Sequence, residues 1–230
     1  MNARELRAAR LAKGWSQVKA AARLAVSQPY LAMLERGQRR LGPQLVQRAA
    51  RLYNLPPAAV PPSPCGVRPR CSAATLGRDL AGLGYPGFAY VRSRSWKPKN
   101  PSEVLLNALA QDDLEPRLAE ALPWLVLRYW TLDWRWAVRE AKLRDLQNRL
   151  GFVVGLARRL AERGGDERKV LTLTKLEAEL DRSRLARTDT LCRASLPESE
   201  RRWLTEHRPD EAKHWNLVTD WTADALRYAA

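Results

Sequence analysis

Residues 16–37, SQVKAAARLAVSQPYLAMLERG, contain the signals that decide the fold of the N-terminal part of the chain. Ser16 and Ser27 stand eleven residues apart, and the hydroxyl of each can cap the start of a helix. Pro29 falls in the first turn of the second of these helices, where its missing N–H leaves no hydrogen bond unmade. Gly37 ends that helix. The spacing therefore predicts two short helices joined by a tight turn.

Three more short helices are predicted around this pair. An apolar pattern from Leu6 to Leu11 predicts a helix that ends at Gly14. Downstream, Pro43 introduces a fourth helix, and Pro56-Pro57 opens a short fifth. The first sixty or so residues are thus expected to form five short helices.

The helix that follows Ser27 carries two kinds of side chain. Leu31 and Leu34 are expected to face inward, whereas Gln28, Tyr30 and Met33 are expected to face outward.

The register of these positions resembles the Cro/C1-type helix-turn-helix family, also called the XRE family. The resemblance covers about residues 4–60 and rests on Ser16-Gln17, Ala21, Val26-Ser27-Gln28, Leu31 and Leu34-Glu35-Arg36-Gly37. It implies a five-helix, lambda-repressor-like domain whose third helix enters the major groove of double-stranded DNA. It also implies that Gln17 contacts a phosphate, that Gln28 reads a base edge, and that Arg10 and Glu35 form a structural ion pair.

Some positions depart from the family pattern. Ala20 stands where a larger Leu is usual, and Ala25 replaces the usual Gly of the turn. A positive φ at that position costs a non-glycine residue about 1 kcal/mol. Pro29 and Tyr30 replace polar residues beside the reading Gln. The resemblance therefore implies DNA binding, but it does not transfer the base sequence that is read.

The chemistry of these side chains points to the same partner. A Gln amide offers a donor and an acceptor in one plane, which matches the N6/N7 edge of adenine, and arginines after the helix can neutralise phosphates. Two roles remain open for Tyr30, a contact to a phosphate or packing on the protein surface. Two also remain open for Met33, a contact to a thymine methyl group or a place at the rim of the DNA interface. The alternative is that the arginines are solvated and Gln28 is only a polar first-turn residue. The expected DNA contacts are Gln17, Ser27, Gln28, Tyr30, Met33, Arg36, Arg39 and Arg40.

The charge of the chain is concentrated at its N-terminal end. The 230 residues carry a formal net charge of +15. Residues 1–62 hold 11 Lys/Arg and 2 Asp/Glu, residues 63–102 hold 7 and 1, and residues 103–230 hold 22 of each sign. The net charge thus lies in residues 1–102, the basic head, whereas residues 103–230, the body, are neutral. A basic head suits a polyanion such as DNA, and a neutral body suits self-association, a protein partner or a small molecule.

Three segments follow from this division: a DNA-binding domain at 1–62, a Pro-rich basic connector at 63–102 and a helical body at 103–230. Nine of the 15 prolines fall between Pro56 and Pro101, and proline removes backbone donors and disfavours helix in the preceding residue. Inside the connector, residues 76–83 predict one short helix, residues 85–88 predict a turn, and a basic tail follows at Arg92, Arg94, Lys97 and Lys99.

The body is predicted to be an all-α helical bundle. From Ser102, a candidate N-cap, helical patterns are expected at 103–111, 114–130, 198–207 and 222–229. A helix of about 30 residues is predicted from Asp133 to the Gly164-Gly165 pair, followed by a reversal into a second helix. Its apolar seam fits an intramolecular bundle and a dimer interface equally well; the seam comprises Leu143, Leu146, Leu150, Val153, Ala157 and Leu160.

Several other classes of protein are disfavoured. Three cysteines, an odd number, and an N-terminus without an apolar run argue against secretion, so we expect a cytoplasmic chain without membrane partners. Cys65, Cys71, Cys192, His207 and His214 lack zinc-ligand spacing. No nucleotide-binding, metalloprotease or serine-hydrolase motif is present. We expect no enzyme, no metal and no cofactor.

Two functions remain in different classes. The first is a sequence-specific transcriptional regulator, a repressor that binds a palindromic operator as a homodimer. The second is an antitoxin, in which the body neutralises a toxin and the head autoregulates the operon. The body carries most of the tryptophans, which are enriched in interfaces and ligand pockets but at helical spacing are more often core. Because this Trp-rich body is larger than a dimerisation tail needs to be, the antitoxin function stays open. A weaker third possibility is RNA or membrane-surface binding through the basic tail.

Overall fold

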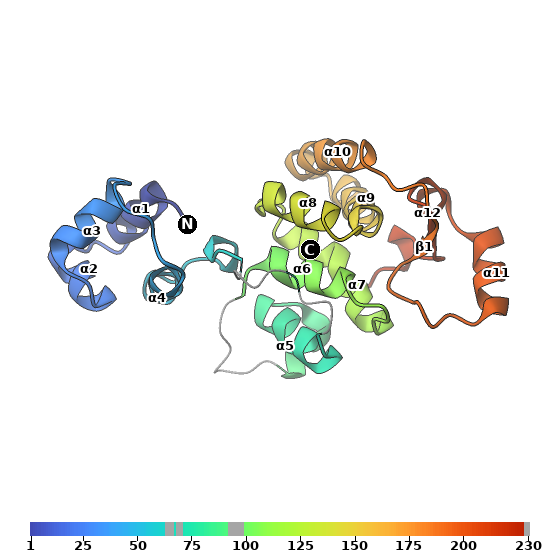
Figure 1. The fold of residues 1–230 in the computed structure, drawn as a ribbon, viewed down its shortest axis with the longest axis horizontal. Coiled ribbons are helices and arrows are strands. Elements are labelled where there is room, and N and C mark those ends of the chain that lie inside the picture. The colour runs from blue at the N-terminus through green and yellow to red at the C-terminus, as the bar shows by residue number, and fades with distance from the viewer. Residues whose placement is uncertain (63–66, 68–70, 92–98, 228–230) are drawn as a thin grey trace. The chain divides into compact units, whose positions relative to one another are not determined.

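The computed structural model describes residues 1–62, 67, 71–91 and 99–227. The described residues form two compact units, an N-terminal unit of residues 1–62 with 99–100 and a C-terminal unit of residues 67, 71–91 and 101–227. Both units are built from helices (Figure 1). Only one short parallel pair of strands occurs in this part of the chain, between β1 (Asp189–Thr190) and β2 (Leu217–Val218). The all-α prediction is confirmed.

The N-terminal unit contains the helices α1 (Ala3–Ala12), α2 (Gln17–Leu24), α3 (Gln28–Glu35) and α4 (Pro43–Tyr53). The predicted fifth helix is a single 3-10 turn, η1 (Pro57–Ala59). Apolar faces of the four helices meet in one core, which comprises Leu6, Ala20, Ala21, Leu24, Leu31, Leu34, Leu45, Ala49 and Tyr53. The small Ala20 is fully buried there.

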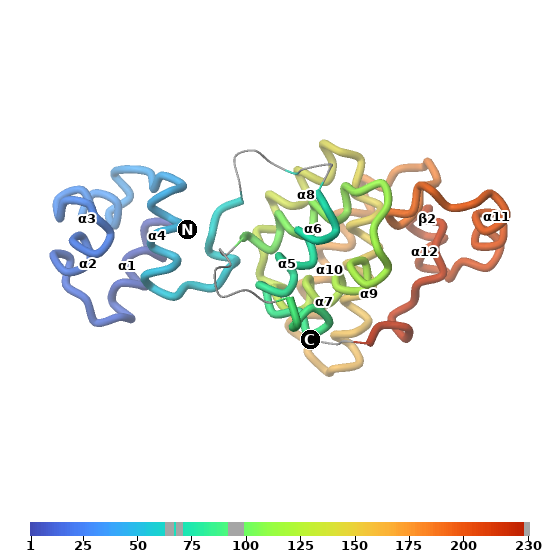
Figure 2. Tube along the Cα trace, turned by 90° about the horizontal axis from the view of Figure 1, so that it is seen from below, coloured from blue at the N-terminus to red at the C-terminus, as the bar shows by residue number. Residues whose placement is uncertain are grey.

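The C-terminal unit is arranged around one long helix, α9 (Gln147–Arg163). It packs against α6 (Pro101–Leu109), α7 (Pro116–Arg128), α8 (Trp134–Lys142), α10 (Glu167–Asp181) and α12 (Asp210–His214). The tube in Figure 2 shows α9 and α10 side by side. Because α9 touches so many neighbours, most of its length is buried.

The segment before α6 also folds with this unit. The short helix predicted at 76–83 is α5 (Ala73–Leu83), which begins three residues earlier than expected, is capped by Ser72 and packs on α6 and α7. A 3-10 segment, η2 (Pro86–Val91), stands where a turn was expected and packs on α5. Ser102 does not cap the next helix, because α6 already begins at Pro101 and encloses it. Of the predicted basic tail, Arg92, Arg94 and Lys97 lie outside the described residues.

The predicted helix of about 30 residues is wrong, because it is two helices. Asp133 caps α8 as expected, but α8 ends at Lys142, and Asp145 adopts a left-handed conformation with φ 57°. The N–H of Leu146 donates to the carbonyl of Ala141 at 2.9 Å, a bond that closes the helix end and lets α9 start in a new direction. No Gly or Pro marks this break, so the apolar spacing runs across it unnoticed.

The predicted reversal into a helical hairpin is correct. Gly165 takes a positive φ of 68° between α9 and α10, which glycine adopts without strain. The apolar seam of α9 is buried within this one chain, including Leu146 and Leu150. Leu143 is not part of the seam, since 71% of its surface is exposed. The seam is therefore a bundle core in this chain.

The last part of the chain forms a small lobe of the C-terminal unit. Here α11 (Glu198–His207), which matches its predicted range, lies at the outer edge of the unit in the ribbon of Figure 1 and in the tube of Figure 2. Leu196 and Leu204 pack with Val218 of β2. The helix expected at 222–229 is wrong over its described part, where only a 3-10 turn, η3 (Ala223–Ala225), is found.

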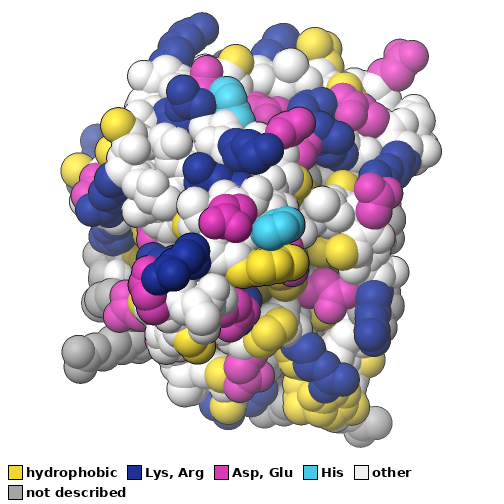
Figure 3. Space-filling view, turned by 90° about the vertical axis from the view of Figure 1, so that its right-hand side faces the viewer, with side chains coloured by type: hydrophobic (Ala, Val, Ile, Leu, Met, Phe, Trp, Pro, Cys, Tyr) yellow, Lys and Arg dark blue, Asp and Glu magenta, His cyan; other side chains and the backbone are white. Residues whose placement is uncertain are grey.

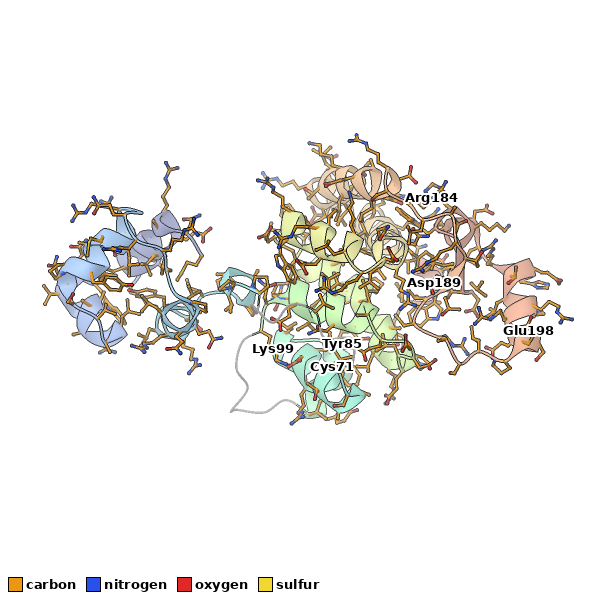
Figure 4. The ribbon with its side chains drawn as sticks, viewed as in Figure 1. Cys71, Tyr85, Lys99, Arg184, Asp189 and Glu198 are labelled. Carbon is orange, nitrogen blue, oxygen red and sulfur yellow. The ribbon has the colours of Figure 1, made fainter. Side chains whose placement is uncertain are left out.

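A tryptophan joins this lobe to α9. Trp215, which is 1% exposed, lies directly over Gly151, and a Cβ built at Gly151 would stand 2.3 Å from its ring. Arg149 also reaches this lobe, and its guanidinium pairs with Asp189 at 2.7 Å and 3.0 Å. Figure 4 shows Arg184 and Asp189 on the side of the unit where α12 and β1 lie. Within the described residues, no helix is long and apolar enough to cross a membrane.

Candidate nucleic-acid interface

The two glutamines singled out from the sequence stand at the starts of α2 and α3. The hydroxyl of Ser16 accepts the backbone N–H of Lys19 at 3.2 Å, and the hydroxyl of Ser27 accepts that of Tyr30 at 3.3 Å. Each serine thus caps its helix as predicted. Gln17 and Gln28 are the first residues after these caps, so both amides lie at a helix N-terminus.

A continuous chain of hydrogen bonds connects these amides to a buried ion pair. Arg10 of α1 binds Glu35 of α3 through two parallel bonds of 2.6 Å and 2.9 Å. Glu35 Oε2 also accepts the side-chain amide of Gln17 at 3.0 Å. In turn, Gln17 Oε1 accepts the amide Nε2 of Gln28 at 2.9 Å. The structure therefore brings Gln17 and Gln28 together, and it confirms the Arg10–Glu35 ion pair.

The charge state of Glu35 is set by its surroundings. Burial opposes ionisation of this carboxyl, but hydrogen bonds from Arg10 and Gln17 outweigh it, so the pKa of Glu35 lies below its ordinary value. The hydrogen bond to Glu35 raises the pKa of Arg10. Tyr53 lies in the same region, and burial raises the pKa of its hydroxyl. At neutral pH Glu35 is ionised and accepts hydrogen bonds without donating any.

This polarity fixes the orientation of both amides. Because Glu35 only accepts, Gln17 must present its NH₂ group to it and its oxygen to Gln28. Gln28 must then present its own NH₂ group to Gln17. Among the described residues nothing donates to Gln28 Oε1, and a second hydrogen on its Nε2 is also left over. One acceptor and one donor of Gln28 therefore stay available, which is the pair that the edge of adenine matches.

The other expected contacts surround this amide pair. Tyr30 and Met33 are half-buried, and the ring of Tyr30 packs against the core as well as facing outward. Arg36 donates from Nε to the carbonyl of Ala32 at 3.2 Å and stays exposed. Arg39 and Arg40 follow α3 and are exposed, and no ion pair involves them within the part of the chain that the structure describes. The surface around α3 is therefore basic.

Two features of this region were not found from the sequence. Nη1 of Arg48, on α4, donates to the carbonyl of Leu24 at 2.5 Å, which is the end of α2. Trp15 precedes Ser16 and packs at a tilt against Tyr53, with the guanidinium of Arg23 4.9 Å from its ring centre. Neither contact is marked by a motif in the sequence. Each joins residues of elements that are distant along the chain, or depends on how the side chains fit together.

The turn between α2 and α3 has the strain that its sequence predicted. Ala25 adopts a left-handed conformation with φ 52° and ψ 51°, where the family pattern has glycine. Arg48 binds the carbonyl just before this residue. A cation at the C-terminal end of a helix interacts favourably with the carbonyls there, so Arg48 holds the turn from outside.

The comparison with known proteins agrees with this geometry. Residues 6–60 match a family model described as helix-turn-helix. This segment is an XRE-family helix-turn-helix domain. The match supports DNA binding and transcriptional regulation of the XRE type, and it covers only this N-terminal part of the 230-residue chain. No curated protein and no solved structure gives a significant match.

Two polar groups of the C-terminal unit make contacts within that unit. Burial raises the pKa of the Cys192 thiol to about 11, and its sulfur lies 3.5 Å from the carbonyl of Leu109. Asp113 accepts the N–H and hydroxyl of Ser195.

Figure 3 shows Lys/Arg and Asp/Glu side chains interspersed over one face of this unit, in keeping with its balanced charge. Cys65, considered above as a metal ligand, lies outside the described residues.

Proposed function

We propose that this regulator binds a specific operator by placing α3 in the major groove, with Gln28 reading an adenine. The hydrogen-bond chain from Arg10 through Glu35 and Gln17 supports this role, because it holds the Gln28 amide in one orientation before DNA arrives. Pre-ordering a polar side chain reduces the entropy lost on binding. Gln28 would donate from Nε2 to adenine N7 and accept from N6 through Oε1.

The remaining contacts would hold α3 in register. Gln17 has one amide hydrogen beyond the one given to Glu35, and that hydrogen suits a phosphate oxygen. Met33 would lie beside a thymine methyl. The other phosphate contacts in this proposal are Ser27, Tyr30, Arg36, Arg39 and Arg40, all of which lie on α3, at its cap or just after it.

The proposal is tested with the full chain and an operator obtained by selection from random duplexes. Gln28→Ala is expected to weaken binding to the selected operator by about 1–3 kcal/mol and to leave affinity for unrelated DNA nearly unchanged. Gln44→Ala on α4 is a matched control for loss of a solvent-exposed amide. Equal losses on both kinds of DNA would remove Gln28 from base reading.

We further propose that the protein acts as a repressor and a homodimer on a palindromic site. One helix-turn-helix reads only a short half-site, and related dimers hold two about 34 Å apart. The α9 seam is filled within the chain, so in this proposal the dimer contact uses another surface. Sedimentation of the full chain with and without operator tests this. A monomer in both conditions would contradict the homodimer.

The antitoxin function is the second candidate. It is supported by the size of the C-terminal unit and by its exposed aromatic surface on α11. There Trp203 is 53% exposed and stacks on His207 with 4.5 Å between ring centres. Co-expression with the product of the adjacent gene tests it: rescue of growth from a toxic product, lost on Trp203→Ala, would support the antitoxin. Rescue retained by Trp203→Ala would exclude this surface.

A further inference from the structure

A cavity of about 310 Å³ lies in the C-terminal unit, between the first turn of α7 and the segment that follows β2. This volume is at the lower end of the range for small-molecule sites, about 300–1,000 Å³. A smaller cavity of about 60 Å³ shares Arg117, Glu120 and Arg227 with it and reaches Tyr85 and Phe88. Figure 4 labels Tyr85 in the lower half of the unit as drawn. The space suits a molecule of amino-acid size.

Charged groups of both signs line this cavity. The residues that line it include two arginines, Arg117 and Arg227, and two acidic residues, Glu120 and Asp220. Within the described residues, no ion pair joins any two of these four side chains. Glu120 Oε1 instead accepts the backbone N–H of Arg227 at 3.1 Å, which fastens the final segment to α7.

The missing ion pairs do not reflect a general lack of pairing here. Asp224, four residues after Asp220, pairs with Arg163 at 2.6 Å. Glu211 pairs with Arg159. Arginines and carboxylates in this part of the chain thus pair where they reach each other. Those around the cavity line its walls instead, so their charges are available to a molecule between them.

The cavity also has an apolar part. Trp221 and Leu226 line it and are half-buried, so each offers surface to a ligand without being covered by the protein. An indole beside an aliphatic side chain is a suitable platform for a small apolar group. The lining therefore combines cationic, anionic and apolar surface within one small volume.

We propose that this cavity binds a free amino acid with an apolar side chain. The ligand carboxylate would be held by Arg117 and Arg227, because guanidinium groups match a carboxylate with paired, charge-assisted hydrogen bonds. Its ammonium group would bind Asp220, with Glu120 nearby, and its side chain would lie on Trp221 and Leu226. A ligand with only one charge leaves half of the polar lining without a partner.

Isothermal titration calorimetry of the full chain tests this with L-leucine and L-phenylalanine. Saturable binding of one or both is expected. N-acetyl-L-phenylalanine lacks the ammonium and L-phenylalaninamide lacks the carboxylate, and each should bind about tenfold more weakly or worse, because a charged hydrogen bond is lost. Binding of either blocked form as tightly as the free amino acid would overturn the proposal, as would the absence of saturable binding.

Variants of the lining supply the second arm. Arg117→Ala and Asp220→Asn should each weaken binding about tenfold or more. Both side chains are exposed, so neither change should unfold the protein, and circular dichroism checks this. Arg128→Ala, at the other end of α7 and also exposed, should bind like the unaltered chain. Unchanged binding by Arg117→Ala would overturn the assignment. None of these outcomes depends on DNA binding by the N-terminal unit.

Discussion

Gln28 Nε2 donates to Gln17 Oε1 at 2.9 Å, and this bond joins the first residues of α2 and α3. It makes the proposed base reader and the proposed phosphate-binding residue one unit. Since Gln17 is itself bound by Glu35, the orientation of the Gln28 amide is determined by a buried ion pair within the motif. Interactions with base and with backbone should therefore be energetically coupled.

The first prediction measures that coupling. Gln17→Ala should weaken operator binding by more than one phosphate hydrogen bond contributes, because the Gln28 amide is then no longer held in one orientation. In a double-mutant cycle with Gln28→Ala, the two effects should be non-additive by about 0.5–3 kcal/mol. Titrations with the selected operator measure all four proteins. Additive effects would show that the two amides act independently on DNA.

The second prediction concerns pH. The pKa of Glu35 is lowered in the folded protein, so its contribution to stability is present above the unfolded value, about 4.3, and is lost as pH falls through the folded value. The protection of amides in α1 and α3, taken as the intrinsic exchange rate divided by the observed rate at the same pH, should fall as the pH is lowered below that unfolded value. Glu35→Gln should flatten this dependence. A variant with the same pH dependence as the unaltered chain would exclude Glu35 as the titrating group.

The third prediction concerns the turn. Ala25→Gly should stabilise the N-terminal unit by about 0.5–1 kcal/mol, because glycine adopts φ 52° without the strain of a Cβ. Arg48→Ala should destabilise the same unit by removing the hydrogen bond to Leu24, and Arg51→Ala, exposed on the same helix, serves as control. Chemical denaturation, monitored by hydrogen exchange of amides in the N-terminal unit, measures the stability of each variant. A destabilising Ala25→Gly would contradict the strain argument.

The fourth prediction concerns the phosphate-binding arginines. Replacing Arg39 and Arg40 by Ala should lower affinity on every DNA sequence. The plot of log K against log salt should flatten by roughly 0.9 for each phosphate that the variant no longer neutralises. Arg4→Ala, exposed on α1, is a control for the reduction of net charge alone. An unchanged slope would mean that Arg39 and Arg40 are only solvated.

The fifth prediction concerns the join between α9 and α12. Gly151→Ala should destabilise the C-terminal unit by about 1–3 kcal/mol, because the new methyl group would meet the Trp215 ring at 2.3 Å. Gly155→Ala is the matched control: its Cβ meets chiefly the end of the Glu177 side chain, at 3.1 Å, and alanine favours the helix. Thermal unfolding compares them. Equal effects at the two sites would show that the Trp215 packing does not limit stability.

Local signals in the sequence determined most of the N-terminal unit. The serine caps, Gly37 and Pro43 are short-range features, and they placed the helices around them correctly because a cap acts within one turn. The positive φ at Ala25 also followed from the sequence, by comparison with a family pattern. The break at Asp145 did not, because no Gly or Pro marks it and the apolar spacing continues across it.

What the tertiary structure alone decided was how distant groups meet. The sequence identified Gln17 and Gln28 as candidates, but only the packing of α1, α2 and α3 joined them to Glu35 and Arg10 and so fixed their amides. The α9 seam likewise suited a bundle or a dimer until folding buried it within one chain. Periodicity shows which apolar residues share one face of a helix. Which partner covers that face depends on long-range contacts, and one segment of sequence does not encode these.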